Sequence, residues 1–271
     1  MTGKQFHQQI QTTRKYDTPA DPDLTAPERL FGRFHTWFRL AMLRQVFVCS
    51  LRYRRHPFTA ASWAPHSYAI IRAAEACGGR LHLRFAEGLE SVHQPVVYAA
   101  NHMRVLETFA LPAMLLPFGM ITMVVKQSLV DYPLFGAVMR AVRPIVVGRK
   151  DPRQDLKTVL NEGTRVLKEE GRAVVIFPQA TREPTFRPRR FNSLGVKLAR
   201  KADVPIVPIA LKTDFYGIGR VVRDVGPVDP SKPIHVHVGD PMQVTGNGKA
   251  QHDAIVAFIA EKVRSWGGRV D

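Results

Sequence analysis

The hydrophobic residues of the chain gather into seven short runs between residues 80 and 238. Most runs are rich in Val and Ile, and most are separated by stretches whose apolar residues recur at helical spacing. Strands that are apolar on both faces are typical of a mostly parallel sheet covered by helices on both sides. We therefore predict an α/β fold with strands at residues 80–86, 95–100, 120–125, 144–147, 173–178, 205–211 and 234–238.

Two helices of this fold are well marked. Asp151 can cap the start of one helix, Pro152 suits its first turn, and Gly171 can end it. Residues 250–266 have the apolar spacing of a closing helix, and residues 267–271 are expected to form a loose tail.

The segment between Arg29 and Arg55 also has apolar residues at helical spacing, with the polar residues in one sector. This pattern predicts a basic amphipathic helix. Such a helix can sink its apolar face below anionic lipid headgroups, or it can pack on its own domain with its arginines in water; both interpretations stay open. The apolar positions include Leu30, Phe34, Trp37, Phe38 and Ala41, and the polar sector contains Arg29, Arg33, Thr36, Arg39, Arg44 and Ser50.

The domain organisation follows from these patterns. Residues 1–28 contain no run typical of a secretory signal and are rich in Pro and Asp near their end, so we expect a poorly ordered tail. Residues 29–78 are expected to form the amphipathic helical region, and residues 79–271 the α/β domain.

The 18 uncharged residues from Thr108 to Val125 are long enough for a membrane span, but Pro112, Pro117 and Gly119 argue for a short helix, a turn and a strand.

Charge narrows the choice of partners. The chain has 39 Lys and Arg against 23 Asp and Glu, a net charge of +16, and Arg29 to Ala74 holds eight arginines without a carboxylate. This balance favours nucleic acid, anionic lipid or phosphorylated substrates. The two cysteines, Cys49 and Cys77, are too few for a disulfide framework, so we expect a reducing compartment and no metal site.

Candidate chemistry lies where the second predicted strand ends. Asn101 and His102 follow this strand directly, at the edge where open α/β folds bind ligands. If a helix begins just after His102, the carboxylate of Glu107 can accept the Nδ1 proton of the imidazole and leave Nε2 to act as a base. A second polar segment, residues 177–182 (FPQATR), follows another strand. Together with Arg187, Arg189 and Arg190 after it, the segment offers arginines that could clamp a phosphate.

Four blocks in order, NHMRVLE, PIVVGR, FPQATR and VPIVPIAL, resemble the lysophospholipid acyltransferase family over roughly residues 80–215. The resemblance implies that His102 is the base and Glu107 its partner, and that Arg149 and Arg182 bind the acceptor's phosphate. It also implies that Thr181 supports the Arg182 loop and that Lys126 and Asn101 help to bind substrate. The chain departs from the family pattern at Glu107, where Asp is usual, and at Gln179 and Ala180, where Glu and Gly are usual.

The expected reaction is direct transfer of a fatty acyl chain from a thioester, either acyl-CoA or an acyl carrier protein, to the hydroxyl of a lysophospholipid such as 1-acyl-glycerol-3-phosphate. No cofactor is expected beyond this co-substrate, and the expected location is the cytoplasmic face of a membrane, as a peripheral protein whose partner is the lipid surface and not nucleic acid. Gln179 also permits a lyso-aminolipid acceptor without phosphate. A non-enzymatic protein that binds membranes or nucleic acid would explain the charge but leave the four blocks unexplained.

Overall fold

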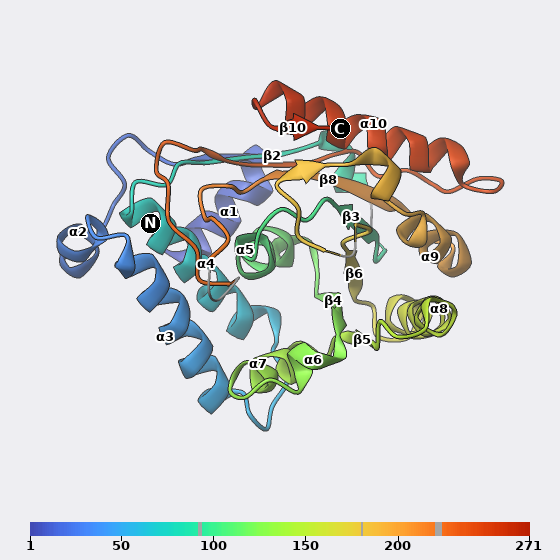
Figure 1. The fold of residues 1–271 in the computed structure, drawn as a ribbon, viewed down its shortest axis with the longest axis horizontal. Helices are drawn as coiled ribbons and strands as arrows, with labels where there is room; N and C mark the ends of the chain where they lie inside the picture. Colours follow the sequence, from blue (N-terminus) through green and yellow to red (C-terminus); the bar gives the residue numbers. More distant parts are fainter. Residues whose placement is uncertain (92–93, 180, 220–223) are drawn as a thin grey trace.

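The computed structural model describes residues 1–91, 94–179, 181–219 and 224–271, and its centre is an eight-stranded sheet (Figure 1). The strand order is β1-β2-β9-β8-β3-β6-β4-β5. All seven predicted strands are present, and the mostly parallel α/β architecture is confirmed. The strands are β1 (Lys15–Asp17), β2 (Leu81–Phe85), β3 (Val97–Ala100), β4 (Ile121–Lys126), β5 (Ile145–Val147), β6 (Ala173–Ile176), β8 (Ile206–Lys212) and β9 (Ile234–Val238).

The five strands β8, β3, β6, β4 and β5 are neighbours in that order and all run parallel. The β9 strand pairs antiparallel with β8, and β2 pairs parallel with β9. The carboxyl ends of the five parallel strands therefore meet at one edge of the sheet, which is where ligands bind in folds of this kind.

Alternate residues of the central strand β3 enter two separate hydrophobic cores. Val97 and Ala99 pack with helices α8, α9 and α10, whereas Tyr98 and Ala100 pack with α1, α3, α4, α5 and α7 on the other face. Figure 1 shows these two helical layers on opposite sides of the sheet. The helices are α1 (Gly3–Thr13), α2 (Ala26–Gly32), α3 (Thr36–Arg52), α4 (Ala60–Ala76), α5 (Leu106–Leu115), α6 (Gln127–Val130), α7 (Phe135–Val142), α8 (Pro152–Lys168), α9 (Leu194–Ala202) and α10 (Lys249–Ser265).

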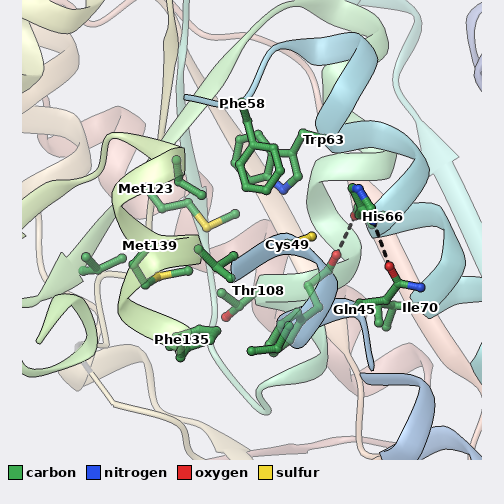
Figure 2. A pocket seen from close by; sticks show the side chains of 16 residues that line it. Gln45, Cys49, Phe58, Trp63, His66, Ile70, Thr108, Met123, Phe135 and Met139 are labelled. Atoms are coloured by element: carbon green, nitrogen blue, oxygen red, sulfur yellow. Dashed lines mark hydrogen bonds between the residues drawn. The ribbon is translucent and has the colours of Figure 1, made fainter. Parts of the chain in front are cut away.

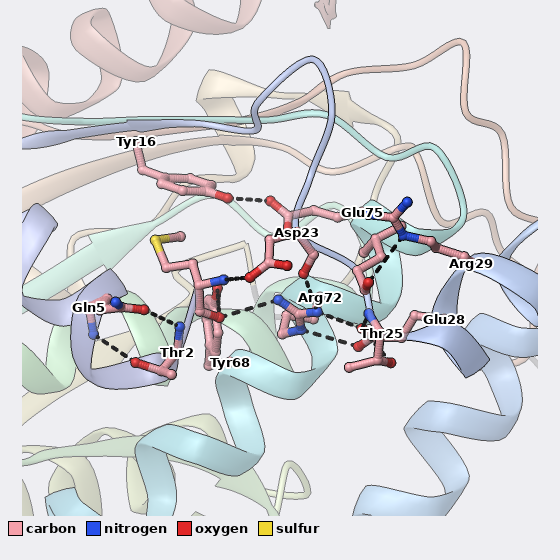
Figure 3. A network of polar contacts seen from close by, with 12 residues as sticks. Thr2, Gln5, Tyr16, Asp23, Thr25, Glu28, Arg29, Tyr68, Arg72 and Glu75 are labelled. Atoms are coloured by element: carbon pink, nitrogen blue, oxygen red, sulfur yellow. Dashed lines mark hydrogen bonds and ion pairs between the residues drawn. The ribbon is translucent and has the colours of Figure 1, made fainter.

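The N-terminal segment differs from its prediction, because residues 1–28 are ordered and not a loose tail. Helix α1 and strand β1 lie within this segment, and β1 pairs with β2. Figure 3 shows the polar contacts of this segment. Within it, the N-terminal ammonium pairs with Asp23 at 2.6 Å, and the hydroxyl of Tyr16 donates to the buried Glu75 of α4 at 2.5 Å. Arg72 pairs with Glu28 at 2.5 Å. All these partners are distant in sequence, which is why local composition gave no sign of them.

The predicted amphipathic helix is two helices, α2 and α3, separated at Arg33 to His35. Gly32 lies against α4 so closely that a Cβ there would be 2.2 Å from the carbonyl oxygen of Ala76. This close approach of the two backbones explains why the chain ends one helix and turns before it begins the next.

The uncharged run divides as expected into α5, a short 3-10 turn (Leu116–Phe118) and β4. Pro112 is accommodated inside α5 because the hydroxyl of Ser67 bridges the broken ladder, donating to the carbonyl of Phe109 at 2.5 Å and accepting from the N–H of Ala113 at 2.8 Å. Across the described ranges, none of the helices combines the length and the apolar character that crossing a membrane requires.

The C-terminal residues are also more ordered than predicted. The helix at residues 250–266 is present as α10, but the expected loose tail contains β10 (Arg269–Val270), which pairs with β7 (Thr185–Phe186). A two-residue strand is too short to show a periodic pattern, so this pairing could not be read from the sequence.

Candidate active site

Four strand ends bring the predicted site residues to one edge of the sheet. Asn101 and His102 follow β3, the segment from Phe177 to Arg182 follows β6, Lys126 ends β4, and Arg149 follows β5. Because neighbouring strands lie about 4.8 Å apart, the backbone at the end of β5 is roughly 14 Å from that of β3. The predicted site residues therefore lie along one edge of the sheet, but those after β3 are well separated from Arg149 after β5.

A fully buried carboxylate orients the imidazole of His102. Oε1 of Glu107 accepts a hydrogen bond from Nδ1 of His102 at 3.1 Å, and also from the backbone N–H groups of Met103 at 2.5 Å and Arg104 at 2.8 Å. Oε2 accepts from the hydroxyl of Thr213 at 2.6 Å. With the Nδ1 proton held in this way, Nε2 is the nitrogen free to accept a proton.

The ring of His102 is also packed in place. It stacks on Phe177, with 4.2 Å between the ring centroids and 24° between the planes. The side chain of His102 is 17% exposed, whereas that of Glu107 is 0% exposed. The imidazole is therefore open to a substrate on one side and fixed on the others, the arrangement that a general base requires.

Burial alone would raise the pKa of Glu107, because a carboxylate is poorly solvated inside a protein. The hydrogen bond and charge of His102, together with the hydrogen bonds from Thr213 and Arg104, outweigh burial, and the pKa of Glu107 is lowered. The carboxylate is therefore ionised at neutral pH, where it can stabilise a protonated His102.

Asn101 has a supporting place and not the substrate contact that the resemblance implied. Its fully buried amide donates to the carbonyl of Leu211 at 2.8 Å and accepts from the N–H of Leu211 at 2.8 Å. Both amide groups are thus committed to β8. Asn101 joins the ends of β3 and β8 and so fixes the backbone that carries His102.

The loop after β6 holds His102 from the other side. Oε1 of Gln179 accepts from the backbone N–H of His102 at 3.2 Å, and the N–H of Glu183 donates to the carbonyl of His102 at 2.9 Å. Thr181 is exposed, and its N–H donates to the carbonyl of Gln179 at 2.8 Å, which closes the turn. The second departure from the family pattern, Ala180, lies outside the described residues.

The basic residues of the site occupy different environments. Arg182 is paired with Asp224. Lys126 and Arg149 are both exposed, and the backbone N–H of Arg149, whose φ is +58°, donates to Asp155 at 2.9 Å. The structure therefore brings Arg182 near His102, while Lys126 and Arg149 lie at the same edge but farther along it.

Sequence reasoning missed Thr213, which is 1% exposed and directly follows β8. Its position just after the VPIVPIAL block was visible, but its contact with Glu107 depends on β8 lying beside β3, which no local pattern reveals. Within the described part of the chain, no three His, Cys, Asp or Glu side chains are grouped in a way that could hold a metal ion.

Replacing Thr213 tests whether it positions the pair. Thr213→Val keeps the shape of the side chain but leaves Oε2 of Glu107 buried without its hydroxyl partner, which should destabilise the fold by about 1–3 kcal/mol. We expect kcat to fall about tenfold with little change in the KM for either substrate, since the base is disturbed and not removed. Thr213→Ser should restore most of kcat, and a Val variant with wild-type kcat would exclude the positioning role.

Comparison with known proteins agrees with this geometry. Residues 83–212 match the sequence model of the family described as Acyltransferase. A 1-acyl-sn-glycerol-3-phosphate acyltransferase of Pseudomonas aeruginosa is 29% identical over 213 residues, covering 78% of this chain and 76% of that protein. One of Chlamydomonas reinhardtii is 34% identical over 125 residues, covering 46% of this chain and 36% of that longer protein.

A solved structure has the same fold. The 1-acyl-sn-glycerophosphate (LPA) acyltransferase PlsC of Thermotoga maritima superposes with a TM-score of 0.61 at 14% identity, over 89% of this chain and 97% of that chain. The protein is an enzyme, an acyltransferase with an α/β fold. Its sequence is similar to those of 1-acyl-sn-glycerol-3-phosphate acyltransferases, and residues 83–212 carry the match to the Acyltransferase family model.

Proposed function

We propose that the enzyme transfers a fatty acyl chain from a thioester to the hydroxyl of 1-acyl-glycerol-3-phosphate or a closely similar lysophospholipid. The observation that carries the proposal is the partly exposed His102 held by the buried Glu107 at the carboxyl edge of the sheet, within an acyltransferase domain. The donor is acyl-CoA or an acyl carrier protein, and the cytoplasmic location expected from the sequence stays a prediction.

In the proposed reaction, Nε2 of His102 takes the proton of the acceptor hydroxyl as its oxygen attacks the thioester carbonyl. The tetrahedral intermediate then collapses, the carbon–sulfur bond breaks, and the departing thiolate receives the proton from the imidazolium. Glu107 stabilises the charged ring between these two proton transfers. Binding both substrates in line supplies much of the remaining acceleration.

An apolar cavity between the helices on one face of the sheet supports the assignment of a fatty acyl substrate. Its lining comes from α3, α4, α5, β4 and α7 and includes Cys49, Trp63, Phe109 and Met139 (Figure 2). Thr108 and Phe109 of this lining directly follow Glu107 on α5, so the same helix carries residues of the cavity and the carboxylate partner of His102. A pocket of this composition is suited to a hydrocarbon chain and not to a nucleotide or a sugar.

The surface of α2 and α3 supports a membrane partner. Phe38, Met42 and Cys49 of α3 face the core, yet the opposite side of the helix is also apolar. Exposed arginines flank this outer face at positions 29, 33, 44, 52, 54 and 55. An apolar stripe flanked by arginines is suited to an anionic lipid surface. The exposed apolar residues are Leu30, Phe31, Phe34, Leu40, Leu43, Phe47 and Leu51.

Substitution of exposed residues tests the membrane proposal without disturbing the core. We expect Leu43→Glu with Phe47→Glu to weaken sedimentation with anionic vesicles at least about tenfold. Two apolar side chains no longer enter the lipid, and two negative charges are repelled by the anionic headgroups. Ala250→Glu with Ala254→Glu, on exposed positions of α10 across the sheet, adds the same charge and should retain most of the binding. Equal losses in both double variants would contradict the assignment of the surface. Added salt should weaken wild-type binding.

A panel of acceptors with one acyl chain in common tests the substrate. We expect 1-acyl-glycerol-3-phosphate to give the highest kcat/KM, above the matched lyso-aminolipid and above 1-acyl-glycerol. A lyso-aminolipid with the higher value would replace the proposed acceptor and leave the reaction type unchanged.

A further inference from the structure

Arg104 differs from the other basic residues next to His102 in having no carboxylate partner. Arg182 pairs with Asp224, and Lys212 pairs with Asp214 at 2.9 Å. The guanidinium of Arg104 donates through Nη1 to the carbonyl of Met103 at 2.9 Å. Its Nε is buried and has no hydrogen-bond partner among the described residues, none of which places a carboxylate within ion-pair distance of it.

This environment is unfavourable for a cation in the absence of a ligand. Burial lowers the pKa of Arg104, and the more distant Glu107 and Asp214 offset this only in part. The positive charge of Arg182 lowers the pKa further. Arg182 precedes Glu183, whose N–H donates to the carbonyl of His102 at 2.9 Å. An anion bound between Arg104 and Arg182 would reduce the repulsion of the two positive charges. It would also offset the loss of hydration that burial costs the guanidinium of Arg104.

A second donor without a partner among the described residues lies beside the backbone of His102. Gln179 is 6% exposed, and its Oε1 is fixed by the backbone N–H of His102. Its Nε2 is buried without a hydrogen-bond partner in the part of the chain that the structure describes. Since both atoms belong to one amide, Nε2 also lies near the backbone of His102. Native proteins rarely leave two such donors unused in one site, which indicates that a ligand completes them.

We propose that Arg104 binds the phosphate of the acceptor together with Arg182, with the amide of Gln179 donating to the same group. This assignment rests on the proposed function and adds a residue to which the resemblance gave no role. In 1-acyl-glycerol-3-phosphate the reacting hydroxyl and the phosphate ester are on adjacent carbons, so the phosphate-binding residues must lie close to His102. Arg104 is two residues from His102 in sequence, whereas the backbone of Arg149 is roughly 14 Å away across the sheet.

The test compares two acceptors that differ only in the phosphate, 1-acyl-glycerol-3-phosphate and 1-acyl-glycerol. Arg104→Met should raise the KM for the phosphate-bearing acceptor about 10- to 100-fold, as expected for losing a charge-assisted contact, and change the KM for 1-acyl-glycerol and for the donor by less than about twofold. Arg104→Lys should recover part of the affinity, because it keeps the charge but not the bidentate geometry. Arg264→Met, at an exposed position of α10 outside the site, is the matched control and should leave every KM unchanged.

Equal effects of Arg104→Met on both acceptors, or none on either, would overturn the proposal, since a structural residue does not distinguish them. A wild-type enzyme that does not use the phosphate-bearing acceptor would instead refute the proposed function. Calorimetric binding of glycerol-3-phosphate then still decides the role of Arg104: wild-type binding that weakens at least about tenfold in Arg104→Met supports it, and no binding by the wild type overturns it.

Discussion

His102→Ala should lower kcat by about 10²- to 10⁴-fold, because it removes the imidazole that takes the proton of the acceptor hydroxyl in the proposed reaction. The side chain is 17% exposed and supports its ring on Phe177, so its removal leaves the two hydrophobic cores intact. The measurement is release of free thiol from an acyl thioester in the presence of acceptor, with the melting temperature recorded in parallel.

The control for this variant is His56→Ala, at an exposed position outside the site. It should keep wild-type turnover, and both variants should sediment with anionic vesicles as the wild type does. Wild-type turnover by His102→Ala with the best acceptor would show that another group is the base.

Glu107→Gln should give the second largest loss of activity, about 100-fold in kcat, because it removes the negative charge that stabilises the protonated ring. The N–H groups of Met103 and Arg104 both donate to Oε1, so an oxygen is expected to remain at this position and the new amide nitrogen to face Thr213. Nδ1 of His102 then keeps a hydrogen-bond acceptor, but the negative charge beside the imidazole is gone. Glu107→Asp, the usual family residue, should retain measurable activity, and equal kcat in the Gln variant and the wild type would exclude an electrostatic role.

Glu107→Gln should also change how the free energy of unfolding depends on pH in the acid range. The pKa of Glu107 is lower in the folded protein than in the unfolded chain, so its ionised form stabilises the fold fully above the unfolded value of about 4.3. This contribution is lost as pH falls through the folded pKa. Chemical denaturation between neutral pH and about pH 3 should therefore show a steeper loss of unfolding free energy in the wild type than in Glu107→Gln.

The sequence was sufficient for those parts of the fold that depend on local pattern. Short Val- and Ile-rich runs predicted seven strands, and the position of Asn101 and His102 after one of them placed both residues at the carboxyl edge of the sheet. The spacing from His102 to Glu107 needed only that α5 begin soon after the strand, which it does at Leu106.

The remaining features depend on contacts between residues far apart in the chain. Thr213 reaches Glu107 because β8 lies beside β3, and Asn101 is engaged by Leu211 for the same reason. The order of residues 1–28 depends on partners in α4. One apolar and one polar sector were predicted for this helix, but α3 is apolar on two sides: Phe38 and Met42 face the core, whereas Leu43 and Phe47 are exposed.

Single-turnover mixing of excess enzyme with a radiolabelled acyl thioester, with and without 1-acyl-glycerol-3-phosphate, tests the central claim most directly. We expect free thiol and diacylated phospholipid to form together and in equal amounts, only when the acceptor is present, and neither to form with His102→Ala. Thiol released at the same rate without acceptor, or label retained covalently on the protein, would contradict direct transfer to the lysolipid hydroxyl.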